Sequence, residues 1–479
     1  MPQGKFTGVK FGAMNAAAAE SRLDQFRSDP RKALWKLSLP VFGGMMIHTL
    51  YSVVDMVFVG RVGADAVAAL AYNLPLVFFA YGTVMGLSSG VTAVLAQAIG
   101  GRDKSRADNI ADHALVLGVV LGGILMVVGL LYGRPMLEML GATGAVNELS
   151  WRYLQVVAIG LPFSVLSGFF RGILTGEGDT VRPMTILGVG MVLNIILDPI
   201  FIFGLDQGVR GAAIATTVSQ AIVFVIFIYL IMIRRTSYVS FNLRAFKFSS
   251  IIMLSIFKIG LPASFSFMVM ATGAAVYNKI LASFSDHAVA AYQVASRIEM
   301  VYFLPLIALS TGCVTLVAMF HGAGATDEIK KIVGYTMSRA VIYGLVFAAI
   351  IIPLAPLVLT IFKPNAEILA YGVSYLRINA LAFPIAPIGI ISARVLQGMG
   401  KGLPFLVVTV LRVMAIGGPL AAYFTFVQHR PLEFVWISMA VSMVGGAAVG
   451  VTWLLMTFRS MPSSLIAEPP IEPAMEGAS

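Results

Sequence analysis

The sequence predicts an all-α polytopic membrane protein, with twelve transmembrane helices in two six-helix lobes related by a pseudo-twofold axis along the membrane normal. The first supporting observation is composition. Hydrophobic residues make up 58% of the 479-residue chain and charged residues 12%, with a mean hydropathy of +0.89, whereas a soluble domain averages about 25% charged residues. Apolar runs of roughly 20 residues recur about twelve times, and each can cross a hydrocarbon core of ~30 Å as a helix.

The second observation is an internal repeat. Leu39-Pro40 returns as Leu261-Pro262, 222 positions later, and the same offset relates Gly100 to Gly322, Tyr153 to Tyr375 and Gly176-x-Gly178 to Gly398-x-Gly400. Membrane proteins with two similar halves are typically transporters whose site lies between the halves. Six spans are an even number, so both halves share one orientation. Their symmetry axis therefore runs along the membrane normal.

Glycine-rich and charged breaks between apolar runs place the spans in order. Arg61-Val-Gly63, Gly100-Gly-Arg102 and Gly322-Ala-Gly324 are such breaks. We expect spans at 36–60, 69–97, 111–132, 152–174, 183–204, 211–233, 251–282, 289–320, 333–361, 373–396, 403–426 and 434–457. The predicted domains are a cytoplasmic segment 1–35, an amino-terminal lobe 36–236, a linker 237–250, a carboxy-terminal lobe 251–458 and a disordered cytoplasmic tail 459–479.

The distribution of Lys and Arg over the connecting loops predicts orientation. The richer loops hold Arg102, Lys104 and Arg106, then Arg234 and Arg235. Both termini should therefore be cytoplasmic, in a multi-pass protein of the inner (plasma) membrane. The net charge of +10 reflects these loops and gives no reason to expect nucleic acid. Residues 20–36 fit either an interfacial helix or a frayed tail.

Ionisable groups inside a span cost at least ~2.5–3.5 kcal/mol, so each calls for an explanation. Asp55 lies six residues before Arg61, roughly 9 Å below the outer edge, and Asp198 lies eight residues before Asp206, roughly 12 Å below it. At a similar depth the sequence places the other members of a predicted cluster: Tyr153, Asn194 and Thr216. Four helices thus bring polar groups to one level of the outer half.

The repeat provides a control for these acids. The partner of Asp55 is Tyr277, and the segment that matches Asn194 to Pro199 is Met414 to Pro419, without a carboxylate. Since both halves must fold, the acids indicate function, although a structural hydrogen-bond cluster that joins spans one, five and six is an alternative. Two nearby carboxylates in a low-dielectric site do not both stay charged, so the cluster can bind a proton.

The deprotonated cluster would offer oxygen ligands to Na⁺ from the side chains of Asp55, Asn194, Asp198 and Thr216. These residues alone do not choose between H⁺ and Na⁺. We expect no other metal and no cofactor. Pro40 removes a backbone hydrogen bond early in span one, so it is either a conformational hinge or an ordinary first-turn proline.

Three further residues are candidates for lining the cavity: His48, Tyr277 and Glu299. For His48 the alternative is a packed histidine. Arg297 and Glu299 fall near the start of span eight, so Glu299 either enters the cavity or stays at the interface.

Several stretches together resemble the multidrug and toxic compound extrusion (MATE) family: KLSLPVFGGMMIHTLYSVVDMVFVGRVGADAVAAL, LSSGVTAVLAQAIGGRD, GILTGEGDTVRPM and NIILDPIFIFG. The match spans about residues 30–458 and is closest to the archaeal and DinF-like branch. The resemblance implies a V-shaped pair of six-helix lobes and cation-coupled efflux. It assigns the coupling cluster to Asp55, Tyr153, Asn194, Asp198 and Thr216, and the bending proline to Pro40. The acids that another branch uses in spans seven and ten are absent, so no sodium site is expected there.

The sequence therefore favours an antiporter that exports organic cations, drugs and other amphipathic compounds, coupled to H⁺ or alternatively to Na⁺, and acting as a monomer. A flippase for lipid-linked precursors is the alternative within the superfamily. It would need a cationic cavity, whereas the charges placed well inside the spans, Asp55 and Asp198, are acidic. An intramembrane aspartyl protease is disfavoured because its GxGD motif is missing around Asp55 and Asp198. We expect no enzymatic activity.

Overall fold

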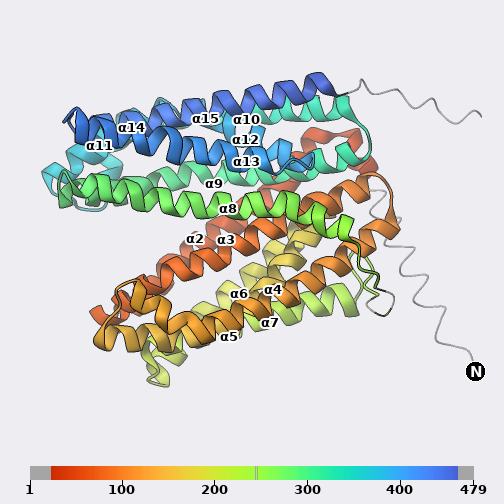
Figure 1. The fold of residues 1–479 in the computed structure, drawn as a ribbon, viewed down its shortest axis with the longest axis horizontal. Helices are drawn as coiled ribbons and strands as arrows, with labels where there is room; N and C mark the ends of the chain where they lie inside the picture. The colour runs from red at the N-terminus through yellow and green to blue at the C-terminus, as the bar shows by residue number, and fades with distance from the viewer. Residues whose placement is uncertain (1–22, 243, 245, 462–479) are drawn as a thin grey trace, which may run out of the picture.

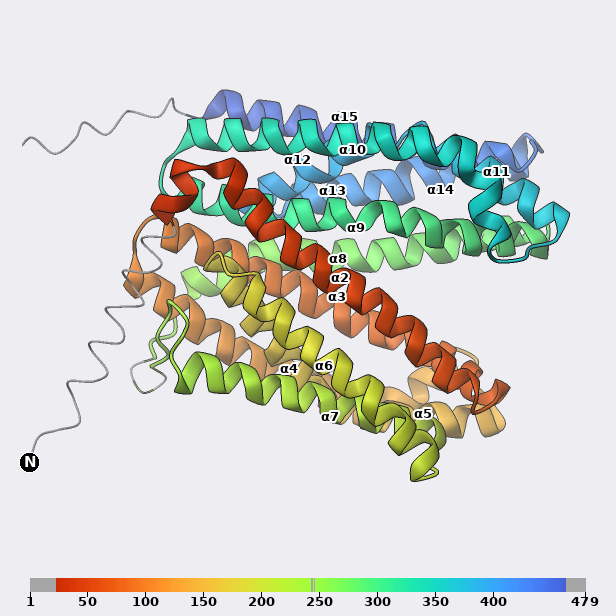
Figure 2. The same ribbon diagram turned by 180° about the vertical axis from the view of Figure 1, so that it is seen from behind.

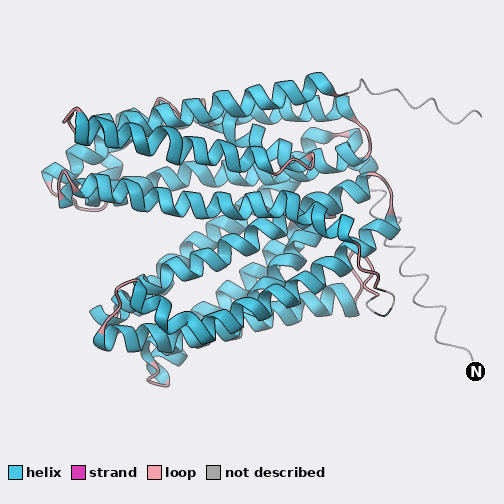
Figure 3. Cartoon of the chain, in the orientation of Figure 1, coloured by secondary structure: helices cyan, strands magenta, loops and turns pink. Residues whose placement is uncertain are grey.

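The computed structural model describes residues 23–242, 244 and 246–461, and every regular element in these ranges is a helix (Figure 3). The helices form two bundles that meet at one end of the molecule and diverge toward the other (Figures 1 and 2). Both ends of the described chain lie where the bundles meet, which we call the terminus end. We call the opposite side the far end. The twelve-helix, two-lobe prediction is thereby confirmed.

The amino-terminal lobe is built from long helices that run past the predicted spans. A helix of 37 residues is about 56 Å long, so it extends beyond a ~30 Å hydrocarbon core. Asp29 and Asp103 cap the starts of two of them by accepting backbone N–H bonds. The elements are α2 Pro30–Gly60, α3 Ala64–Gly100, α4 Lys104–Met139, α5 Gly144–Gly176, α6 Val181–Pro199, η1 Ile200–Gly204, α7 Gly208–Ile228 and η2 Tyr229–Ile233.

The carboxy-terminal lobe repeats this plan with more interruptions. Its elements are α8 Ser250–Ala282, α9 Asp286–Gly322, α10 Thr326–Thr360, α11 Ala366–Ala380, α12 Ala386–Gly398, α13 Leu403–Val410, η4 Leu411–Gly417, α14 Gly418–Ala422, η5 Tyr423–Val427 and α15 Glu433–Ser460. Within the described residues, eleven helical stretches are long and apolar enough to cross a membrane. The remaining span is the one composed of α11 and α12.

The span expected over 373–396 is present but is not one continuous helix. The chain turns between Ala380 and Ala386, at Pro384, and α12 then starts with Pro387 in its first turn. The repeat partner Pro162 lies inside an unbroken α5. Each proline removes a helix donor, but α10 keeps Pro353 and Pro356, also three residues apart, inside one helix. Proline spacing by itself therefore does not explain this break.

The two lobes meet at the terminus end through glycines. An ideal Cβ at Gly100 would lie 1.9 Å from the carbonyl oxygen of Met319, and one at Gly322 would lie 1.9 Å from that of Gln97. Both pairs of positions are related by the 222-residue offset. The contact is therefore twofold symmetric, and the pseudo-twofold axis passes between α3 and α9.

The described part of the segment 20–36 packs against both lobes at the terminus end. Residues 23–28 are helical, and the side chains of Leu23 and Phe26 are buried. Asp24 pairs with Arg102 at 2.7 Å in the amino-terminal lobe, and Arg27 lies 3.6 Å from Glu328 in the carboxy-terminal lobe. Residues 20–22 and most of the expected tail, 462–479, lie outside the described residues.

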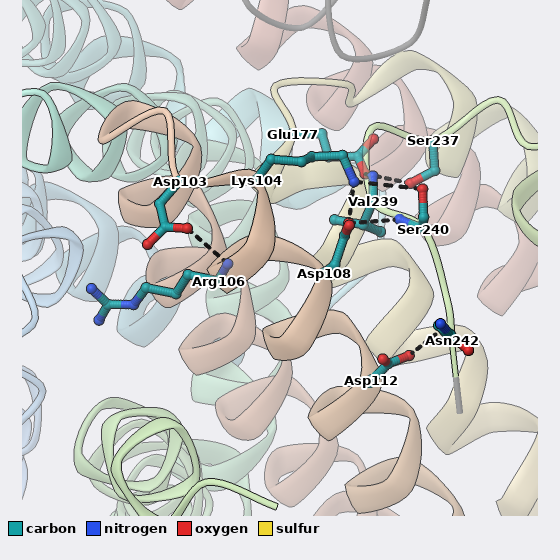
Figure 4. A network of polar contacts seen from close by, with 10 residues as sticks. All are labelled: Asp103, Lys104, Arg106, Asp108, Asp112, Glu177, Ser237, Val239, Ser240 and Asn242. Atoms are coloured by element: carbon teal, nitrogen blue, oxygen red, sulfur yellow. Dashed lines mark hydrogen bonds and ion pairs between the residues drawn. The ribbon is translucent and has the colours of Figure 1, made fainter. Parts of the chain in front are cut away.

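Acidic side chains of the amino-terminal lobe hold the linker between the lobes in place (Figure 4). Glu177 accepts the backbone N–H of Val239 at 3.1 Å and the hydroxyl of Ser237. Asp108 accepts the N–H of Ser240 at 2.7 Å, and Asp112 accepts that of Asn242 at 3.2 Å. These bonds satisfy backbone donors of a segment without regular structure, so the linker packs as part of the amino-terminal lobe.

Candidate functional site

The five polar residues predicted to form one cluster converge in the amino-terminal lobe. Asp55 comes from α2, Tyr153 from α5, Asn194 and Asp198 from α6, and Thr216 from α7. Asp198 is 0% exposed and Asn194 2% exposed, while the other three are half-buried. Asn194 and Asp198 share a helix face because they are four residues apart. Burial of a carboxylate at this depth indicates a functional group rather than a packing residue.

Asn194 links three helices of the cluster. With its amide nitrogen facing the acids, it donates to the Tyr51 hydroxyl at 2.8 Å and to Asp198 Oδ2 at 3.1 Å, and its oxygen accepts the backbone N–H of Thr216 at 3.0 Å. The Tyr51 hydroxyl also bonds to the side chain of Thr216. The position of α2 relative to α6 and α7 therefore depends on polar contacts near Asp55.

The two carboxyl groups lie within hydrogen-bonding reach of each other. A hydrogen bond between Asp55 and Asp198 requires a proton, because two ionised carboxylates have only acceptor atoms. Asp198 Oδ1 is buried and receives no hydrogen bond from any described side chain or backbone group. A buried, unpaired carboxylate oxygen is costly when the group is charged. The arrangement can therefore exchange a proton, or a small cation in its place.

The local helix geometry supports this arrangement. Directly after Asp198, Pro199 ends α6, and the chain continues as the π-helical turn η1. Pro199 has no N–H, so the carbonyl of Ile195, one turn earlier, loses its helical partner. Widened turns of this kind are frequent at functional sites in helices.

Sequence reasoning missed Tyr51, which lies one helical turn before Asp55 on α2. A signal was available, because positions i and i+4 of a helix are neighbours and Tyr51 is a polar group in an apolar span. Its repeat partner is Gly273, so this phenol, like the acids, belongs to one lobe alone.

The other predicted residues lie outside the cluster. Pro40 is ten residues into α2, so it is an interior helix proline and not a first-turn residue. His48 is exposed on α2 and lies edge-on to Tyr51, with ring centroids 6.1 Å apart. Tyr277 and Glu299 are each 8% exposed and lie inside the carboxy-terminal lobe. Glu299 is thirteen residues beyond the start of α9 and is not an interfacial residue.

A single monovalent cation could be held by the carboxylates of Asp55 and Asp198 with the neutral oxygens of Asn194 and Thr216, since hard cations take oxygen ligands. Across the described ranges, no three or more His, Cys, Asp or Glu side chains gather as a metal site would require. The cluster thus has a donor set for a proton or a weakly held cation.

Comparison with known proteins gives consistent results in both lobes. The MatE family model matches residues 40–200 and 262–423, one match in each lobe. The multidrug export protein MepA of Staphylococcus haemolyticus (strain JCSC1435) is 27% identical over 377 residues, which covers 78% of this chain and 82% of MepA.

Solved structures of similar proteins share the fold. One is described as a MOP superfamily transporter from Pyrococcus furiosus Vc1, with 30% identity, a TM-score of 0.87 and coverage of 92% of this chain and 99% of the other. Another is an outward-facing multidrug resistance MATE family transporter, with 30% identity, a TM-score of 0.86 and coverage of 92% and 98%. The two-lobe fold, the internal repeat and the family match in both halves lead to one conclusion: the chain belongs to the MATE family of membrane transporters.

Proposed function

We propose that this protein exports amphipathic organic cations and drugs across the plasma membrane in exchange for protons that bind at the Asp55–Asp198 pair. The single observation that carries the proposal is this pair, two carboxyl groups in hydrogen-bonding reach of each other deep in one lobe. The relatives described as multidrug export proteins support the class of cargo.

Loop charge and the position of the lobes support an orientation that suits the proposed export. The loop after α3 carries Arg102, Lys104 and Arg106 at the terminus end. An excess of Lys and Arg marks cytoplasmic loops. The terminus end would then face the cytoplasm, and the lobes would diverge toward the outside (Figure 2). This is the conformation in which an exporter releases cargo and takes up its coupling ion.

The contacts within the cluster favour H⁺ over Na⁺. Asp55 and Asp198 are close enough to share a proton. A Na⁺ ion bound between their carboxylates would keep the two oxygens farther apart than a shared proton does. With its amide nitrogen turned toward the acids, Asn194 satisfies Tyr51 and Asp198 without a cation.

Proton binding would act on α2. One proton on the pair removes one of its two negative charges and allows the direct hydrogen bond between α2 and α6, so α2 moves toward the interior of the amino-terminal lobe. Pro40 lacks a backbone donor and offers a point at which α2 can bend. The space available to cargo then shrinks, and cargo leaves to the outside. Proton and cargo must oppose each other for such an exchange.

Cargo affinity as a function of pH tests the proposal. Ethidium binding to the purified protein should strengthen as pH rises through the titration of the pair, by at most about tenfold per pH unit for each proton displaced. The dependence should flatten in Asp55→Asn, which keeps the side-chain shape without the titrating group. If the ethidium affinity of the wild type is independent of pH but changes with Na⁺ concentration, the coupling ion is Na⁺ and the proton assignment is wrong.

A further inference from the structure

Two buried carboxylate oxygens in the described part of the chain have no hydrogen-bond partner, and there is one in each lobe. They are Asp198 Oδ1 and Glu299 Oε1. The first belongs to the proposed coupling site. The second lies in the carboxy-terminal lobe, on α9, roughly 20 Å along the helix from Asp286. A carboxylate buried without full pairing is costly, so Glu299 needs an explanation of its own.

Aromatic residues enclose Glu299. Its Oε2 accepts the hydroxyl of Tyr375, the repeat partner of Tyr153. The ring of Tyr375 meets that of Trp436 edge-on, with centroids 5.0 Å apart, and Tyr292 stacks on the same indole at 6.3 Å. Tyr375 and Trp436 are fully buried. One oxygen of Glu299 is thus held in a fixed position, while the other faces no donor.

Arg412 is the charged group that faces Glu299. It extends from η4, close enough to interact electrostatically with Glu299 and with Tyr277 of α8. Within the described residues its guanidinium group makes neither a hydrogen bond nor an ion pair within 4.0 Å. Gly446 of α15 lies beside the aliphatic stem of Arg412, since a Cβ there would be 3.6 Å from Arg412 Cβ and 3.8 Å from Cδ. The guanidinium is therefore not fixed by a partner among the described residues.

The remaining titratable groups near Glu299 are all phenols. Its neighbours on the elements packed around it are Tyr277 of α8, Tyr292 and Tyr302 of α9, and Tyr375 of α11. From α15 the neighbours are Trp436 and Ser442, which do not titrate. Arg412 is the only cation that interacts with Glu299 among these described neighbours. Among these neighbours, the negative charge of Glu299 can therefore be removed only by a proton or balanced only by Arg412.

The repeat argues against a purely structural role. At the 222-residue offset, Glu299 and Arg412 correspond to Val77 and Gly190, and in the register that matches Met414 to Asn194 the residue opposite Arg412 is Val192. The amino-terminal lobe therefore forms the same helix arrangement without this acid or this base. Each lobe has a carboxyl site that the other lobe lacks, and the π-helical turn beside each site, η1 and η4, is a feature often found at functional positions.

We propose that Glu299 is a second proton-binding carboxyl of the exchange and that Arg412 is the tethered cation that neutralises it when the proton leaves. This inference rests on the proposed proton-coupled export. A proton from the outer solution forms an O–H bond at Oε1. On release that bond breaks, the proton passes to water on the cytoplasmic side, and the carboxylate left behind pairs with the guanidinium. A buried acid is then never left uncompensated.

The steady-state ethidium gradient reports how many protons are exchanged per ethidium molecule. In proteoliposomes with the membrane potential held at zero by K⁺ and valinomycin, each exchanged proton adds about one decade of ethidium gradient per pH unit. We expect the slope of the logarithm of the ethidium ratio against the pH difference to fall by one in Glu299→Gln. Gln keeps the size and the acceptor for Tyr375. The control Glu367→Gln, an exposed acid of the same lobe that pairs with His287, should keep the wild-type slope.

The outcomes separate the two proposals. A wild-type slope of zero would refute proton coupling itself. A nonzero wild-type slope that is unchanged in Glu299→Gln would overturn only the role of Glu299. Should Glu299→Gln be inactive, infrared spectra of the purified protein decide: the band of a protonated carboxyl that disappears at high pH should be missing in Glu299→Gln and persist to higher pH in Arg412→Met. A spectrum of Glu299→Gln identical to the wild type would also overturn the assignment.

Discussion

Replacing Gly100 by alanine should shift the protein away from the conformation described here. The added Cβ would lie 1.9 Å from the carbonyl oxygen of Met319. Carbon and carbonyl oxygen atoms approach to about 3.3 Å at closest. The two backbones must therefore separate by about 1.4 Å at the point where the lobes meet. Both atoms belong to backbone, so no side-chain rotation relieves the overlap.

The energy of this overlap sets the size of the effect. Inserting a methyl group into a well-packed contact typically costs about 1–3 kcal/mol. The contact between Gly100 and Met319 closes the terminus end, so a conformation open at that end does not bear the cost. The ratio of the two conformations should change by about 5- to 150-fold in favour of opening at the terminus end. Gly322→Ala should have the same effect, because its Cβ would lie equally close to Gln97.

Distances between spin labels on the two lobes at the terminus end provide the assay. The control is Gly334→Ala on α10, where a Cβ meets nothing within 4 Å and alanine favours the helix. We expect longer distances in Gly100→Ala and Gly322→Ala and no change in the control. Equal distance distributions in all three variants would refute the reasoning. A large difference between Gly100→Ala and Gly322→Ala would refute the twofold symmetry of the contact.

Three further outcomes are expected. Asp55→Asn should abolish proton-driven ethidium transport in proteoliposomes while Tyr277→Phe, at its repeat partner, retains most of it; an equally deep loss in both would contradict the asymmetry between the lobes. Pro40→Ala should reduce turnover more than ethidium affinity, because it restricts bending of α2; unchanged turnover would make Pro40 a passive residue. Glu177→Ala leaves the buried donors of Ser237 and Val239 unpaired, which costs about 1–3 kcal/mol each. The midpoint of its thermal unfolding should therefore lie below that of the exposed control Glu367→Ala. Equal midpoints would show that the linker hydrogen bonds contribute little to stability.

The sequence by itself determined the membrane class, the number of spans, the repeat and the two acids. These features are local or periodic: an apolar run of sufficient length must be a helix in a bilayer because its backbone groups have no other partners. The 222-residue offset also revealed that Asp55 and Asp198 have no counterparts in the second half. Pro384 and Pro387 lie at the break between α11 and α12, but Pro353 and Pro356 have the same spacing inside the unbroken α10, so the proline pattern alone could not predict the break.

Only the tertiary structure decided which groups meet. The contact between Asp55 and Asp198, the place of Tyr51 beside Asn194, and the burial of Glu299 near Arg412 all join helices far apart in the chain. The expected span 289–320 begins only three residues after the observed start of α9 at Asp286, so the boundary did not decide the position of Glu299; its burial inside the lobe was visible only in the structure. Hydrophobic periodicity records which residues avoid water. It does not record how a helix is rotated against its neighbours, and that rotation determines whether a buried acid faces a proton partner, a cation or another acid.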